Sequence, residues 1–222
     1  MRLKFALAAV AATLIGIAPA IAQDDLSVEQ MLGAWQKQKQ VFQEAESNGL
    51  GRTRGLTLVT VQGAVAAEAA APQAVPAQPG AAEAPAPVTA TADMAAPTDP
   101  NKPLVFGQLD PELQVNLQIR FGFDSAALAD DQKPRLDKIC QAMKQSDVKL
   151  FRIVGHTDTS GPDTYNERLS VLRAKEVTRY LTEDCGIAAA RLETLGLGER
   201  FPLDPKKPDA EENRRVEFQA LS

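Results

Sequence analysis

Residues 155–174 read GHTDTSGPDTYNERLSVLRA, and the segment 165–181 within and after this stretch has helical periodicity. With about 3.6 residues per turn, one broad arc of this helix is apolar. Its members are Tyr165, Leu169, Leu172, Val177, Tyr180 and Leu181. Asn166, Ser170 and Arg173 project within or beside the same arc. A guanidinium turned toward a core is costly unless a carboxylate or a ligand meets it. We therefore expect Arg173 to face the acid just upstream, Asp158.

The chain around this stretch alternates between strand and helix patterns. Strands are predicted at 115–121, 148–154, 191–197 and 215–221, and helices at 131–146 and from Pro162 or Asp163 to Gly186. The order β-α-β-α-β-β predicts an α/β fold, a two-layer sandwich with the helices on one face of a mixed sheet. We assign this domain to residues 104–222. The loop 198–213 is long and rich in Pro, Asp and Lys, so we expect it to be functional or mobile.

The first 22 residues have the pattern of a secretory signal peptide. Arg2 and Lys4 precede an apolar core of 13 residues, which is short of the roughly 20 that span a bilayer. An A-x-A cleavage site ends at Ala22. Removal of this segment would change the net charge from −5 to −7, because two basic residues leave with it. We expect a mature chain without a transmembrane segment, located in the periplasm of a Gram-negative bacterium, with association with its outer membrane as an open alternative.

Two further segments precede the domain. Residues 23–63 contain a helical pattern that ends near Asn48, and a short strand at 56–61. This segment is too small for a core of its own, so it docks on the later domain, self-associates or meets an envelope protein through residues 24–61. Residues 64–103 hold 16 Ala and 8 Pro among 40 positions, which indicates a disordered linker and a tether.

Composition excludes some functions and favours others. No basic patch indicates nucleic-acid binding. The two cysteines, Cys140 and Cys185, lie in one domain of an exported chain, which favours a disulfide over two separate thiols. Such a bond would close a loop of about 45 residues and stabilise by roughly 3–4 kcal/mol. With two Cys and one His, a zinc site is not expected, and no cofactor is predicted.

The ordered motifs of the domain resemble a known family. They are Phe123-Asp124-Ser125, Gly155-His156-Thr157-Asp158, Gly161, Tyr165-Asn166, Leu169-Ser170, Arg173-Ala174, Val177, Gly196 with Gly198, and Asn213-Arg214-Arg215-Val216. With these motifs, residues 112–221 resemble the OmpA-like C-terminal peptidoglycan-binding domain, which also occurs in peptidoglycan-associated lipoprotein and in flagellar stator proteins. The N-terminal half has no such resemblance.

The resemblance implies non-covalent binding of peptidoglycan through the meso-diaminopimelate of its peptide stem. By this resemblance Asp158 holds the ligand ammonium and Arg173 its carboxylate, for which the planar guanidinium is well shaped. Asn166 would bind the stem's backbone, and the turn at Asp124 would line the groove. Thr157 and Leu169 are further expected contacts. Arg215 is expected to point at a ligand carboxylate, with Arg214 a weaker candidate. From the residues alone, an internal Asp158–Arg173 ion pair explains the pattern about equally well.

Two rival functions remain from the sequence. A hydrolase could be built from His156, Asp158 and Ser170, but Ser170 lies within a predicted helix and lacks an exposing strand-turn-helix elbow. We therefore predict that the protein is not an enzyme and that His156 forms hydrogen bonds that shape its turn. The second rival is a protein-interaction adaptor in which residues 24–61 or the loop 198–213 have the main role.

Overall fold

The computed structural model describes residues 26–48, 52–61, 65–68, 104–119, 121 and 125–222. The predicted signal peptide and residues 69–103 of the predicted linker lie outside these ranges. The helices are α1 (Val28–Asn48), α2 (Lys133–Gln145) and α3 (Asp163–Glu183). The strands are β1 (Arg52–Thr53), β2 (Leu56–Val61), β3 (Val65–Glu68), β4 (Leu104–Leu109), β5 (Val115–Leu117), β6 (Phe151–Gly155), β7 (Leu192–Gly196) and β8 (Val216–Ala220). Single 3-10 turns occupy Asp130–Gln132, Ala189–Arg191 and Glu211–Asn213.

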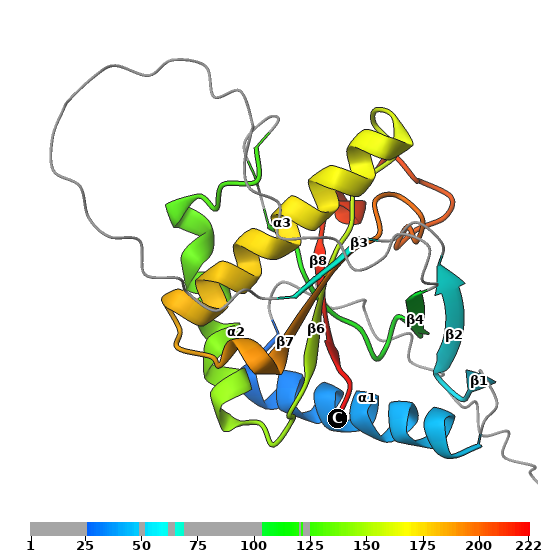
Figure 1. Cartoon of the computed structure of the whole chain (residues 1–222), viewed down its shortest axis with the longest axis vertical. Coiled ribbons are helices and arrows are strands. Elements are labelled where there is room, and N and C mark those ends of the chain that lie inside the picture. The colour runs from blue at the N-terminus through cyan, green and yellow to red at the C-terminus, as the bar shows by residue number, and fades with distance from the viewer. Residues whose placement is uncertain (1–25, 49–51, 62–64, 69–103, 120, 122–124) are drawn as a thin grey trace, which may run out of the picture.

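The main sheet is mixed and has the strand order β3-β7-β6-β8-β5. Strands β6 and β7 are parallel, whereas β8 is antiparallel to β6 and to β5. Helices α2 and α3 cover one face of this sheet (Figure 1). Alternate residues of each strand point to that face, so Phe151, Ile153 and Phe218 are fully buried beneath the helices. The predicted α/β class with helices on one face of a mixed sheet is confirmed.

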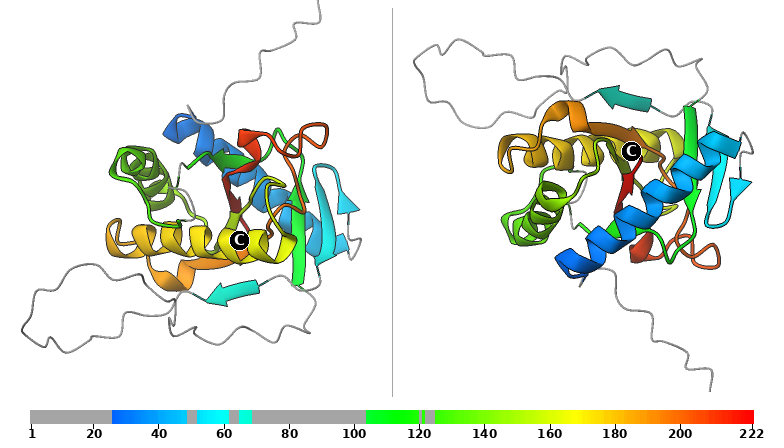
Figure 2. Two further views of the ribbon diagram at one scale, coloured as in Figure 1. Left: turned by 90° about the horizontal axis from the view of Figure 1, so that it is seen from above. Right: turned by 90° about the horizontal axis from the view of Figure 1, so that it is seen from below.

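A second, three-stranded sheet of order β1-β2-β4 lies beside the opposite face of the main sheet. Both views of Figure 2 place β2 and β4 at the side of the molecule away from α2. Phe106 of β4 and Val61 of β2 pack there against Val154 and Leu195. Of this sheet, the sequence predicted only the strand 56–61. Strand β3 was not predicted either: it falls inside the predicted linker but pairs with β7.

Side chains from the main sheet and from the residue before β5 cover the edge of β4 that does not pair with β2. The side chains of Arg152, Gln219 and Gln114 donate hydrogen bonds to carbonyl oxygens of β4. The acceptors are Val105 (3.2 Å), Gly107 (2.7 Å) and Leu109 (2.8 Å), respectively. An open strand edge would expose these acceptors to a further strand. The two sheets are therefore joined by side chain–backbone hydrogen bonds in addition to apolar contacts.

Helix α1 docks on the domain, which answers one alternative left by the sequence. Trp35 is fully buried and lies edge-on to Phe151, with ring centroids 4.8 Å apart. Further along the helix, Phe42 and Ala45 pack against Leu56 and Leu109 of the small sheet. The apolar face of α1 is thus covered from within the chain. Figure 1 shows α1 running across the end of the sheet near the C-terminus.

Helix α3 approaches the sheet at backbone distance near its N-terminal half. A Cβ atom added at Gly155 would lie 2.1 Å from the Ser170 carbonyl oxygen, and one at Gly196 would lie 2.3 Å from Val171. The side chains that face the sheet along this half of α3 are those of Asn166, Ser170, Val171 and Ala174, which are all buried. Tyr165 and Leu172, expected in the apolar arc, are therefore turned outward and are 40% and 53% exposed.

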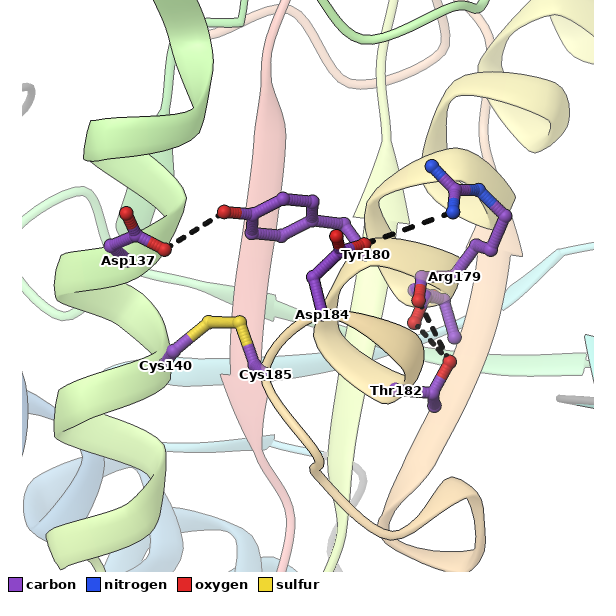
Figure 3. Close-up of a disulfide and its surroundings, with 8 residues drawn as sticks. Asp137, Cys140, Arg179, Tyr180, Thr182, Asp184 and Cys185 are labelled. Atoms are coloured by element: carbon purple, nitrogen blue, oxygen red, sulfur yellow. Dashed lines mark hydrogen bonds and ion pairs between the residues drawn. A yellow bond between two sulfur atoms is a disulfide. The ribbon is translucent and has the colours of Figure 1, made fainter. Parts of the chain in front are cut away.

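Cys140 of α2 and Cys185, just after α3, form a disulfide, as predicted (Figure 3). The Cα atoms are 5.9 Å apart, and both residues are buried. The Tyr180 hydroxyl donates a hydrogen bond of 2.8 Å to Asp137 beside the bond. Asp137 and the two cysteines form the one group of three possible metal ligands within the described ranges, and two of its members are joined to each other.

Candidate functional site

Asp158 lies in the turn between β6 and α3, at one end of the main sheet. Its side chain is 7% exposed. Its Oδ1 accepts a 2.9 Å hydrogen bond from the Ser160 amide, and Arg214 Nη1 donates to its Oδ2 at 2.6 Å. Burial alone would raise the pKa of Asp158, but these hydrogen bonds outweigh it and hold that pKa below its usual value. The acid is therefore ionised at neutral pH.

Arg173 is buried in α3 and has no hydrogen-bond acceptor among the described residues. It is 9% exposed, and among the described residues no carboxylate or carbonyl lies within hydrogen-bonding or ion-pair distance of its guanidinium. The guanidinium carbon sits 4.9 Å from the centroid of the Phe121 ring. Burial lowers the pKa of Arg173 below its ordinary value. The expected direct pair with Asp158 is thus wrong, because Arg214 takes that place.

A small cavity opens beside this arginine. It has a volume of about 190 Å³ and is lined by Gln118, Ile119, Phe121, Arg173, Glu211 and Arg214. Two guanidinium groups therefore face one space, and Glu211 supplies the one carboxylate among the described residues that line it. Such a cavity is electrostatically suited to a ligand that brings a carboxylate.

Arg214 and Arg215 point to opposite sides of the sheet, and this corrects the expected role of Arg215. Arg215 is 5% exposed and donates to Asn116 Oδ1 (3.3 Å) and to the Phe201 carbonyl (3.2 Å). It lines a separate cavity of about 330 Å³ next to the small sheet. Arg215 is therefore not placed to meet a ligand held by Asp158. The alternation in β8 carried the signal: Val216 and Phe218 face the helices, so Arg214 shares their side.

Asn166 and Ser170 face inward from α3, as the sequence predicted, and both are buried. Asn166 Nδ2 donates to Glu199 Oε2 (2.5 Å) and more weakly to the Asp158 carbonyl (3.3 Å). The Ser170 hydroxyl donates to the Glu167 carbonyl and accepts from the Gly198 amide. Both side chains thus tie the helix to its neighbouring loops, and Ser170 has no position as a nucleophile.

Of the other expected site residues, the structure describes Thr157 and Leu169 but not Asp124. Thr157 is buried next to Asp158, its amide donates to the Gly198 carbonyl (2.9 Å), and its hydroxyl has no partner within the described part of the chain. Leu169 is half-buried on α3. Asp124 and its neighbour Phe123 lie outside the described residues. Glu211, Gln118 and Phe121 were not predicted, since nothing in the local pattern marks them as neighbours of Arg173.

His156 belongs to a buried charged cluster on the far side of the sheet. Its Nε2 lies 3.3 Å from Glu217 Oε2, and Arg215 approaches the same oxygen at 3.8 Å. Burial, with the nearby charge of Arg215, lowers the pKa of His156 to about 4, so the imidazole is neutral at pH 7. The cluster lies apart from Asp158 and Ser170, and no catalytic triad is assembled from these residues.

The loop 198–213 is held in place by Asn213, which is fully buried. Its side-chain Nδ2 donates to the carbonyls of Lys207 (2.8 Å) and Pro208 (3.0 Å), and its Oδ1 accepts from the Leu203 backbone amide (2.8 Å). Pro208 in turn accepts a hydrogen bond from the Thr159 amide (3.2 Å). This loop therefore supports the turn that carries Asp158, and its expected functional or mobile character stays a prediction.

Comparisons with known proteins match the part of the chain that carries these motifs. Residues 120–215 match the sequence profile of the OmpA family. The chain is 36% identical over 107 residues to the outer-membrane lipoprotein YfiB of Pseudomonas aeruginosa, covering 47% of this chain and 63% of that protein. It is 34% identical over 107 residues to outer membrane porin F of Pseudomonas fluorescens, covering 47% of this chain and 32% of that protein. Residues 120–215 of this chain are thus similar in sequence to the OmpA family.

A solved structure also matches this part. The peptidoglycan-associated lipoprotein of Burkholderia pseudomallei is 29% identical to it, with a TM-score of 0.41, and the match covers 49% of this chain and 92% of that one. The chain spans about a third of the length of porin F and less than two thirds of YfiB. Within the described ranges, no helix combines the length and apolar character needed to cross a membrane.

Proposed function

We propose that this protein binds peptidoglycan non-covalently through the diaminopimelate of the peptide stem and so attaches an envelope protein to the wall. The observation that carries the proposal is Arg173, a buried guanidinium that finds no acceptor in the described part of the chain and lines a cavity in the region that matches the OmpA family. The Burkholderia relative named above is described as peptidoglycan-associated. The wall polymer supplies the carboxylate that Arg173 lacks.

The free end of diaminopimelate carries an ammonium and a carboxylate on one carbon. The carboxylate would lie between Arg173 and Arg214, which both face the cavity. The ammonium would approach Asp158, whose pKa below the usual value keeps it ionised. Charge-assisted hydrogen bonds of this kind contribute about 1.5–3 kcal/mol each. Asn166 and Thr157 would support the turn around Asp158, and Leu169 would meet the stem from α3.

The envelope location follows the same proposal. A signal peptide at 1–22 would export the chain to the periplasm, where the wall lies. The Ala- and Pro-rich segment would act as the tether. An adaptor role through the apolar face of α1 is not favoured, because Trp35 and Phe42 already use that face for contacts within the chain. A hydrolase is not favoured either, because Ser170 is engaged in two hydrogen bonds with the backbone.

The test is co-sedimentation of the full chain with purified diaminopimelate-type peptidoglycan. We expect Asp158→Ala and Arg173→Met to lose sedimentation by at least tenfold. Arg168→Met, which removes an exposed arginine from the same helix, is the matched control and should sediment like the wild type. Release of soluble fragments by the wild type would instead indicate an enzyme, and full sedimentation of both site variants would refute the site.

Urea unfolding of the same variants separates binding from folding. Arg173 has no acceptor in the described chain, so Arg173→Met removes an uncompensated buried charge, at the cost of one cation–π contact of about 0.5–1 kcal/mol. We expect its free energy of unfolding to stay within about 1 kcal/mol of the wild type. A loss of several kcal/mol would favour a structural role for this arginine.

A further inference from the structure

Arg214 holds two acids at the rim of the candidate site. Its Nη1 lies 2.6 Å from Asp158 Oδ2, and its Nη2 lies 3.3 Å from Glu211 Oε1. The Asp158 side chain is 7% exposed, whereas that of Arg214 is 40% exposed. The buried Asp158 is therefore already paired with a cation. That cation, Arg214, is the more exposed member of the pair.

Both oxygens of the Asp158 carboxylate are engaged in this arrangement. Oδ1 accepts from the Ser160 amide, and Oδ2 accepts from Arg214. An amine that reaches Asp158 must share Oδ2 with Arg214 or displace it. In either case two cations meet at one acid, with Arg173 as a third positive charge at the same cavity. An amine alone is repelled there, because the one carboxylate among the described lining residues, Glu211, is already paired with Arg214.

A carboxylate on the same carbon as the amine changes this balance. It offers Arg214 a new acceptor when Asp158 is given up, and it offers Arg173 an acceptor that the described residues do not provide. Glu211 keeps hold of the other side of the Arg214 guanidinium, so the side chain can turn without leaving the cavity. The exchange conserves the number of ion pairs around Arg214.

Resting on the proposed function, we propose that Arg214 is a specificity-determining residue, which makes access of an amine to Asp158 depend on an adjacent carboxylate. Arg173 supplies attraction for the carboxylate, and Arg214 supplies rejection of ligands without one. Glu211 is the positioning residue that retains Arg214 at the rim. Selectivity in this site therefore has a repulsive part as well as an attractive part.

The test compares two probes that differ only in carboxylates: meso-diaminopimelate and 1,5-diaminopentane, which is the same molecule without its two carboxylates. Calorimetric titration of the full-length wild type should detect diaminopimelate and show at least a hundredfold weaker binding of diaminopentane. Arg214→Met should reduce this ratio at least tenfold, with a gain in diaminopentane binding. Arg173→Met should lose diaminopimelate and gain nothing, because Arg214 still occupies Asp158.

Each outcome has a distinct meaning. An unchanged ratio in folded Arg214→Met, or loss of both probes, overturns the role of Arg214. Failure of the wild type to bind diaminopimelate refutes the proposed function itself. If Arg214→Met does not fold, NMR of the wild type still tests the role of Arg214. The Arg214 guanidinium NMR signals should shift on addition of diaminopimelate and stay in place with diaminopentane, and equal shifts with both probes would contradict the exchange.

Discussion

At the scale of single residues, Arg173 and His156 are two of the ionisable side chains that the described fold buries. Arg173 is charged and lacks an acceptor within the described ranges, and His156 is enclosed beside Arg215 and Glu217. We propose a ligand as the partner of the first, whereas the second belongs to a buried cluster within the chain. Burial of a polar group is thus informative only together with its partners: His156 has an internal neighbour, whereas Arg173 faces a cavity.

The enclosed histidine makes stability depend on pH in a defined window. Its pKa of about 4 is below the unfolded value of about 6.5, so the unfolded chain binds the extra proton first. Stability contributed by the neutral imidazole is complete above about pH 6.5 and is lost as pH falls toward 4, by roughly 3 kcal/mol in all. Urea unfolding between pH 7 and pH 4 should show this fall.

His156→Gln is the matched comparison, because the chain has no other histidine. The variant should show a flatter profile between pH 6.5 and 5, whatever its absolute stability. Carboxyl groups titrate mostly below this range, so they contribute little to the slope there. Equal slopes for the wild type and the variant would mean that the imidazole is accessible to protons in the folded state.

At the scale of elements, the sequence predicted the segments whose periodicity is long and missed those whose pattern is short. Helices α2 and α3 and the strands β6, β7 and β8 lie within one to three residues of the predicted ranges. Strand β4 reads LVFGQL, which has no clean alternation, and β3 lies in Ala-rich sequence. Both strands exist because partners distant in the sequence provide their hydrogen bonds, which a local pattern does not record.

The contacts of the candidate site likewise divide into those that the sequence predicted and those that it missed. The inward direction of Asn166, Ser170 and Arg173 could be predicted from helical spacing. The pairing of Asp158 with Arg214 could not, because it depends on how the loop before β8 returns to the turn after β6. Glu211 enters the cavity through the same return. Contacts set by one element were therefore accessible from the sequence, and contacts between two loops were not.

Helix α1 shows how an added element becomes part of the domain. Gln38 is fully buried, donates to the Leu113 carbonyl (2.6 Å), and accepts from the Ala220 amide (2.7 Å) at the end of β8. Gln38→Ala leaves these backbone groups without partners, and we expect a loss of about 1–3 kcal/mol in the free energy of unfolding. Gln36→Ala, an exposed position on the same helix, should change it by less than about 0.5 kcal/mol.

Hydrogen exchange locates this effect. In the Gln38→Ala variant the Ala220 amide should lose protection more than the amides at the centre of β6, because its acceptor is the removed side chain. Uniform loss along both strands would show that α1 stabilises the domain only through apolar contacts such as that of Trp35 with Phe151.

At the scale of the whole molecule, the disulfide lies just after the C-terminal end of α3, whereas the proposed site lies at the middle of this helix and before its N-terminal end. The site uses Arg173 and the turn before the helix, whereas the disulfide joins Cys185, just after the helix, to Cys140 of α2 (Figure 3). The bond closes a loop with a sequence separation of 45. It restricts the unfolded chain, so its loss lowers stability by about 3–4 kcal/mol without moving the site.

The double substitution Cys140→Ser with Cys185→Ser tests this separation. Its midpoint of urea unfolding should fall, while sedimentation with peptidoglycan stays within about twofold of the wild type at low temperature, where both proteins remain folded. The Asp158→Ala variant supplies the converse case, with binding lost and folding kept. Parallel loss of binding and stability in the cysteine variant would show that the α2–α3 contact transmits order to the site, because Asp158 would then depend on a bond at the far end of the helix.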